Sequence, residues 1–161
     1  MDNQQETQNS YIAGLMDGEG SFSLSVVNSR GIENYRADVT FTNTDPELIR
    51  HIVKYLKKHK LNHYIRGDVR KNKKTCYQVS ITKLEHKIIF IELVKEYLVG
   101  DKRYEAELVE EFCKSRLNCL KSYKATRDEK GRFVKGFKSP YLEREKYLYR
   151  KIGRASCRER V

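Results

Sequence analysis

The chain has 161 residues, of which 39% are hydrophobic and 34% charged, and its formal net charge is +11. This length suits one globular domain with a proper core and is short for two. The sequence contains no run of about 18 apolar residues, the length that a transmembrane helix needs, and its polar N-terminus lacks the apolar region of a signal peptide. We therefore expect an intracellular protein without membrane contacts.

The first part of the chain is predicted to form a helix and two strands. Residues 1–9 are expected to be disordered and to precede a short helix that Ser10 caps and that ends near Gly18. Strict alternation of apolar and polar residues predicts strands over residues 21–28 and 35–43. Each strand would turn its apolar side toward a core and its polar side away from it.

The middle of the chain is predicted to contain a second helix and a second pair of strands. In "TDPEL", Thr44 or Asp45 can cap a helix, and Glu47 completes a capping box with Thr44. Strands are predicted over residues 64–70 and 75–82, and "KNKK" between them reads as a hairpin turn.

The last part of the chain is predicted to be helical, with a basic arm. Helices are expected over residues 83–98 and 102–120, whereas residues 121–150 read as a basic arm that ends in a short helix. Residues 151–161, "KIGRASCRERV", resemble the in-frame translation of a common sequencing adapter. We expect the natural reading frame to be interrupted near Arg150 and exclude this tail from the fold prediction.

This order of elements, α-β-β-α-β-β-α-α, predicts an α+β domain in which helices cover one face of a four-stranded antiparallel sheet. Between residues 50 and 74 the chain has ten Lys or Arg and one acidic residue. Such a cluster is typical of proteins that bind nucleic acid, and a solubilising surface is the alternative.

The stretch "YIAGLMDGEGSF" combines features that point to a site. The spacing of Gly14 and Gly18 lets a helix pack closely, either against its own sheet or against a copy of itself across a two-fold axis. Asp17 and Glu19 follow at the C-terminal end of the helix, where the dipole disfavours negative charge, so a cation or a basic side chain is expected beside them. Paired carboxylates beside a basic surface suit Mg²⁺-dependent phosphodiester cleavage, although a turn with exposed acids has the same composition.

This stretch resembles the motif of the LAGLIDADG homing endonucleases, and "FTNTDPELI", "DKRYEAELVEEF" and the order of elements agree with the single-motif type. The resemblance covers about residues 11–120, so we expect one endonuclease domain over residues 10–120. It implies a homodimer that cuts a long pseudo-palindromic site in double-stranded DNA, uses Mg²⁺ or Mn²⁺, and serves intron or intein mobility. It also implies a saddle-shaped sheet in the DNA major groove and motif helices that form the dimer interface through Tyr11, Gly14, Leu15 and Gly18.

The resemblance implies roles for individual residues as well. Glu19 would bind the metal as the catalytic carboxylate, where the family usually has Asp, and Asp17 would be a structural, helix-capping acid. Asp45 matches a polar residue that orients water, with capping of the next helix as the rival role. Lys102 matches a basic residue near the cleaved phosphates, and Arg103 is its possible substitute.

DNA would be contacted by the outward positions of the strands and by the hairpin. These positions are Ser23, Ser25, Arg36, Asp38, Thr40, Thr42, Arg66, Asp68, Arg70, Lys73 and Gln78. A merely solvated face is the alternative for any one of them. A non-cleaving relative, acting as an RNA maturase or a DNA-binding protein, is the alternative for the whole chain. An unrelated RNA-binding domain is disfavoured because the outward positions lack aromatic residues.

Overall fold

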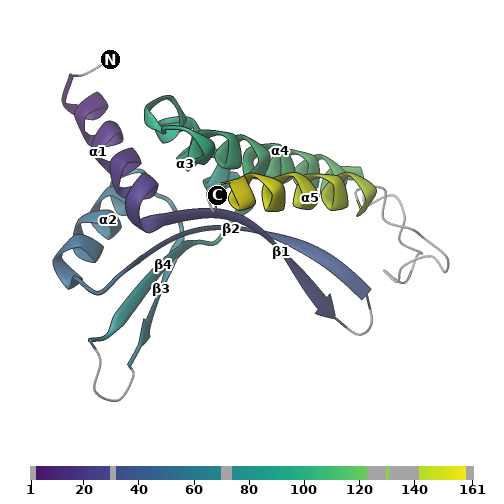
Figure 1. Cartoon of the computed structure of the whole chain (residues 1–161), viewed down its shortest axis with the longest axis horizontal. Coiled ribbons are helices and arrows are strands. Elements are labelled where there is room, and N and C mark those ends of the chain that lie inside the picture. Colours follow the sequence, from purple (N-terminus) through teal and green to yellow (C-terminus); the bar gives the residue numbers. More distant parts are fainter. Residues whose placement is uncertain (1–2, 30–31, 70–73, 123–129, 131–141, 159–161) are drawn as a thin grey trace.

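The computed structural model describes residues 3–29, 32–69, 74–122, 130 and 142–158 (Figure 1). Its elements are, in order, α1 (Asn3–Glu19), β1 (Gly20–Ser29), β2 (Ile32–Asn43), α2 (Pro46–Lys58), β3 (His63–Asp68), β4 (Cys76–Ile81), α3 (Leu84–Val94), the 3₁₀ turn η1 (Lys95–Tyr97), α4 (Asp101–Ser122) and α5 (Leu142–Arg158). The predicted α+β class is confirmed. Of the arm predicted over residues 121–150, the stretches 123–129 and 131–141 lie outside the described residues.

One antiparallel sheet organises the domain, with the strand order β1-β2-β4-β3. The β1–β2 ladder is long and runs from the pair Gly20 and Phe41 to the pair Ser29 and Ile32. The β2–β4 ladder is short and involves only the last part of β2. The two hairpins therefore separate below the helices, and the sheet takes the predicted saddle shape (Figure 1).

The core lies between the upper face of this sheet and the helices. Phe22 of β1 and Val39 and Phe41 of β2 are almost completely buried. The ring of Phe41 meets that of Phe90 of α3 edge-on, with centroids 5.8 Å apart. Burial of each such side chain contributes about 1.5–3 kcal/mol, and the alternation of the strands leaves their polar residues on the opposite face.

Helix α1 begins at Asn3, so the prediction that it starts after Ser10 and follows a disordered segment was wrong. The Ser10 hydroxyl donates to the Thr7 carbonyl inside the helix instead of capping it. Asn9 is buried, and its Oδ1 accepts a hydrogen bond of 2.7 Å from the Tyr55 hydroxyl of α2. This polar contact between distant segments orders a stretch that has no apolar periodicity of its own.

Helix α5 is longer than the predicted short helix because it continues through residues 151–158. It is joined to α4 by Glu145, which is fully buried and accepts from Arg116 at 2.5 and 2.6 Å. Arg116 also donates to the Tyr35 carbonyl of β2 at 2.9 Å. One ion pair thus connects α5, α4 and the sheet. Among the described helices, none combines the length and the apolar composition that crossing a membrane would require.

The junction between α1 and β1 requires glycine, which predicts a selective loss of stability. A Cβ at Gly20 would lie 2.7 Å from the carbonyl oxygen and 2.8 Å from the Cα of Met16. We expect Gly20→Ala to lower the free energy of unfolding by about 1–3 kcal/mol in urea denaturation. Gly67→Ala is the control, because its Cβ would meet Thr75 at an ordinary 3.6 Å. Equal effects of the two substitutions would contradict the steric interpretation.

Candidate nucleic-acid interface and catalytic site

Most polar residues of the four strands lie on the face of the sheet opposite the helices. The exposed Tyr64 lies on this face as well, because it pairs with Ser80, so the prediction that the outward positions lack aromatic residues was wrong. Cross-strand pairs place Ser23 beside Asp38, and Gln78 between Thr42 and Arg66. The register brings together the described members of the predicted DNA-binding set, which are Ser23, Ser25, Arg36, Asp38, Thr40, Thr42, Arg66, Asp68 and Gln78. Arg70 and Lys73 lie outside the described residues.

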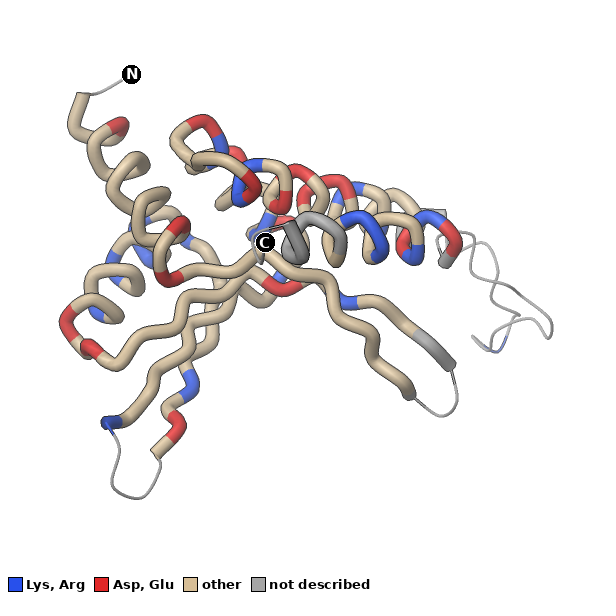
Figure 2. Tube along the Cα trace, in the orientation of Figure 1, with Lys and Arg blue, Asp and Glu red and all other residues tan. Residues whose placement is uncertain are grey.

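The centre of this face is a groove. Its lining comes from β1, β2 and β4 and consists of Ser21, Ser23, Arg36, Asp38, Thr40, Thr42, Gln78 and Ser80. Hydroxyl groups and one amide make up most of this lining. Figure 2 shows few charged residues along the strands, in contrast to α4 and α5. Short hydrogen-bonding groups of this kind can meet base edges as donors or acceptors.

Arg36 is the charged donor of the groove and is held by Asp38. Its Nε lies 3.0 Å from Asp38 Oδ1, and the Ser25 hydroxyl donates to Asp38 Oδ2 at 2.9 Å. The Arg36 side chain is 64% exposed. An ion pair this exposed contributes little stability, so the guanidinium is directed but free to exchange partners.

The two acids of the motif have different surroundings. Glu19 is exposed at the end of α1, directly before the strand that lines the groove. Asp17 is partly buried, and its Oδ1 is buried without a hydrogen-bond partner among the described residues. Burial raises the pKa of Asp17, while the Val99 N–H and the charge of Lys102 act to lower it. Asp17 thus contacts the loop before α4, and Glu19 is open to solvent.

Lys102 lies in a cavity beside the groove, whereas Arg103 does not line it. The lining of this cavity includes Ser21 and Ser23 of β1 together with Lys102 and Glu105 of α4. Arg103 instead pairs with Glu107 on the exposed side of α4. Of the two basic residues, the structure places Lys102 next to the strand that follows Glu19.

Asp45 is the N-cap of α2. Its Oδ1 accepts from the Glu47 N–H at 2.8 Å, and its own N–H donates to Asn43 Oδ1 at 2.8 Å. The capping role is therefore present in the structure, and a role in orienting water remains a prediction.

The glycines of α1 face away from the rest of the chain. A Cβ at Gly14 or Gly18 would meet nothing within 4 Å, while Ile12, Ala13 and Met16 form the buried side of the helix. The alternative that these glycines serve packing against the chain's own sheet is therefore wrong. Together with Tyr11, which is 49% exposed, they form an open helix face.

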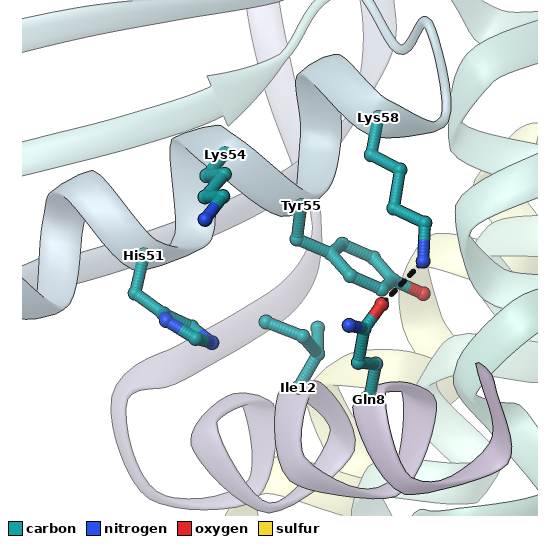
Figure 3. Close-up of a pocket in the computed structure, with 6 residues that line it drawn as sticks. All are labelled: Gln8, Ile12, His51, Lys54, Tyr55 and Lys58. Atoms are coloured by element: carbon teal, nitrogen blue, oxygen red, sulfur yellow. Dashed lines mark hydrogen bonds between the residues drawn. The ribbon is translucent and has the colours of Figure 1, made fainter. Parts of the chain in front are cut away.

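A pocket between α1 and α2 lies beside this open face (Figure 3). Its lining residues are Gln8, Ile12, His51, Lys54, Tyr55 and Lys58. The Lys58 ammonium donates to Gln8 (Figure 3). The His51 ring contacts that of Tyr11, with centroids 5.0 Å apart. None of the lining residues is acidic.

The acidic residues of a single chain fit a metal ion that takes most of its ligands from phosphate oxygens and water. No group of three or more His, Cys, Asp or Glu that could hold an ion occurs among the described residues. Mg²⁺ is commonly bound through one or two carboxylates together with phosphate oxygens and waters. The exposed Glu19 carboxylate fits that mode of binding, and the described part of the chain forms no all-protein cage.

Two charged residues of this region were not predicted from the sequence. Lys87 of α3 is only 5% exposed, and its Nζ donates to the Ala37 carbonyl of β2 at 2.7 Å. Burial lowers the pKa of Lys87. Glu105 is 8% exposed and lies 3.5 Å from Lys102. The spacing of Lys102 and Glu105 on one helix side was the available signal for their contact, and no local pattern indicated Lys87.

Known proteins share this sequence pattern and this architecture. A family model described as LAGLIDADG-like domain matches residues 6–95, and no curated protein sequence matches the chain. The homing endonuclease I-CvuI, solved with a DNA target, superimposes with a TM-score of 0.61 at 20% identity, covering 94% of this chain and 98% of I-CvuI. The archaeal intron-encoded I-Vdi141I, complexed with DNA, gives 0.58 at 16% identity, covering 95% and 99% of the two chains. The group I intron-encoded I-CeuI gives 0.64 at 12%, covering 91% and 66%. These similarities show a shared fold.

The capping role of Asp45 predicts different effects of two substitutions. Asp45→Ala removes the acceptor for the Glu47 N–H and is expected to lower the free energy of unfolding by about 0.5–2 kcal/mol. Asp45→Asn keeps an acceptor and is expected to leave stability close to that of the unchanged protein. Urea denaturation of both variants measures this, and equal losses would contradict capping by the side chain.

Proposed function

The chain belongs to the family of LAGLIDADG-like domains, and from this membership we propose that it is a site-specific endonuclease that hydrolyses double-stranded DNA. One observation carries the proposal: the exposed Glu19 ends α1 directly before β1, whose Ser21 and Ser23 line both the polar groove and the cavity that contains Lys102. A carboxylate for a metal, a cation for developing charge and a surface for base edges are the parts that such a reaction needs.

Recognition would come from the groove of the sheet. Arg36, Arg66 and Gln78 can donate to the edges of guanine or adenine in the major groove. The serine and threonine hydroxyls beside them can donate or accept and so adapt to either base of a pair. The neighbouring structures solved with DNA make double-stranded DNA the substrate to test.

Cleavage would consist of attack by water on a phosphate, with breakage of the bond to the 3′ oxygen. The products are a 5′-phosphate and a 3′-hydroxyl. A Mg²⁺ ion held by Glu19, which Mn²⁺ can replace, would supply Lewis-acid stabilisation of the phosphate. The Lys102 ammonium would stabilise the negative charge that develops on the phosphate oxygens.

A homodimer would place two such sites on one duplex. The open face of α1, with Tyr11, Gly14, Leu15 and Gly18, is the surface through which two copies would meet. Because both glycines lack side chains, two helices can approach closely and bring the two copies of Glu19 near the dimer axis. A two-fold assembly then predicts a long pseudo-palindromic target, one half for each sheet.

Selection from a random duplex library tests this function directly. Incubation with Mg²⁺ and sequencing of the cleaved ends is expected to return one long, pseudo-palindromic site. Enrichment of bound but uncut duplexes would overturn the nuclease proposal and favour a non-cleaving DNA-binding relative. Binding of RNA alone would favour a maturase.

Glu19→Gln is expected to abolish cleavage of the selected duplex, because the metal loses its carboxylate ligand. Binding of the same duplex in Ca²⁺, measured by fluorescence anisotropy, should persist, since the groove is untouched. Glu85→Gln, at an exposed position in the first turn of α3, serves as the control and should cleave normally. Simultaneous loss of binding and cleavage in Glu19→Gln would show that Glu19 is structural.

Gly14→Leu is expected to convert the dimer into a monomer in sedimentation velocity. A Cβ at this position meets no atom within 4 Å, so the free energy of unfolding of the monomer should not decrease. Gly14→Ala adds far less volume and should reduce dimerisation only in part. An unchanged dimer in Gly14→Leu would reject this interface.

A further inference from the structure

Lys102 is surrounded by charged side chains from three helices. Its Nζ lies 3.5 Å from Glu105 Oε2, one turn further along α4. Its charge also acts on Asp17 at the end of α1. Arg150 of α5 lines the same cavity and is exposed. From β1 the cavity receives only hydroxyl and apolar side chains, so Glu105 is the carboxylate in direct contact with Lys102 among the described residues.

Burial makes the contact between Lys102 and Glu105 different from an ordinary surface ion pair. The side chain of Glu105 is 10% exposed and that of Lys102 is 24% exposed. A buried carboxylate is costly without a positive partner, and the attraction is screened less than it would be in bulk water. Lysine has a flexible four-carbon stem, so a fixed carboxylate restricts where its ammonium can lie.

We propose that Glu105 is a positioning residue, which holds the Lys102 ammonium in the cavity beside β1 where the scissile phosphate would lie. The functional part of this inference rests on the proposed nuclease activity, whereas the contact itself does not. Glu105 transfers no proton and binds no metal in this role. It acts only through Lys102.

The same helix offers a matched control. Arg103 and Glu107 also form an ion pair on α4, with 3.6 Å between Arg103 Nε and Glu107 Oε1. Both of their side chains are 52% exposed, and neither lines the cavity. Glu107→Gln therefore removes the same charge from the same helix without disturbing Lys102.

The test compares Glu105→Gln, Glu107→Gln, Lys102→Met and the double variant Glu105→Gln/Lys102→Met. Single-turnover cleavage of the library-selected duplex in Mg²⁺ is expected to slow about tenfold or more in Glu105→Gln, because misplacement of a catalytic group is costly. Binding in Ca²⁺ should be unchanged. Glu107→Gln should behave like the unchanged protein, and Glu105→Gln should add no further loss to Lys102→Met.

Carbon-13 relaxation at Lys102 Cε gives a readout that does not need activity. Mobility is expected to rise in Glu105→Gln and to stay constant in Glu107→Gln, and the same spectra report whether each variant is folded. If Glu105→Gln unfolds, Glu105→Asp can be used instead, because it keeps the charge on a shorter side chain. Part of the cleavage rate and part of the restricted motion of Lys102 should then remain.

Three results would overturn the inference. They are a Glu105→Gln rate equal to that of Glu107→Gln, an undiminished effect of Glu105→Gln in the Lys102→Met background, and unchanged Lys102 mobility in Glu105→Gln. A failure of the unchanged protein to cleave any duplex would overturn the proposed function instead. The relaxation measurement would then still decide whether Glu105 holds Lys102.

Discussion

The backbone passes from α1 into β1 at Gly20, where the close approach of Met16 leaves no room for a Cβ. Three features of the fold depend on this junction. It fixes the buried side of α1 against the core, leaves the glycine face of the helix open, and starts β1 in the register that pairs Gly20 with Phe41. Because Glu19 is the last residue of the helix, its position relative to the groove depends on the same turn.

Buried charges fix the helices over the sheet. Arg116 and Glu145 connect α4 and α5 to β2, and Lys87 connects α3 to the same strand through the Ala37 carbonyl. Buried charges are costly to desolvate and are tolerated only with well-placed partners. They therefore favour one arrangement of helix and strand over others, which apolar packing alone would specify less sharply.

Charged residues and short hydrogen-bonding residues are concentrated in different parts of the chain. The groove contains mainly hydroxyl and amide groups, with Arg36 directed by Asp38. The excess of positive charge in the sequence is concentrated between residues 50 and 74, a stretch that includes α2 and β3. In protein–DNA complexes, contacts to phosphates supply affinity and register, whereas contacts to base edges supply sequence information. The proposed function uses both regions of this chain in that way.

The sequence by itself determined the elements whose signals are local. Alternation predicted the strands and their polar face, and the glycine spacing predicted a helix that packs closely against a neighbour. Whether those glycines face the chain's own core was decided only by the tertiary structure, because a helix pattern does not say which neighbour covers each side. The ordered start of α1, the buried Lys87 and the contact between Asp17 and Val99 were also set by distant segments. Such contacts depend on which distant segments folding brings together, and the local spacing of residues does not predict them.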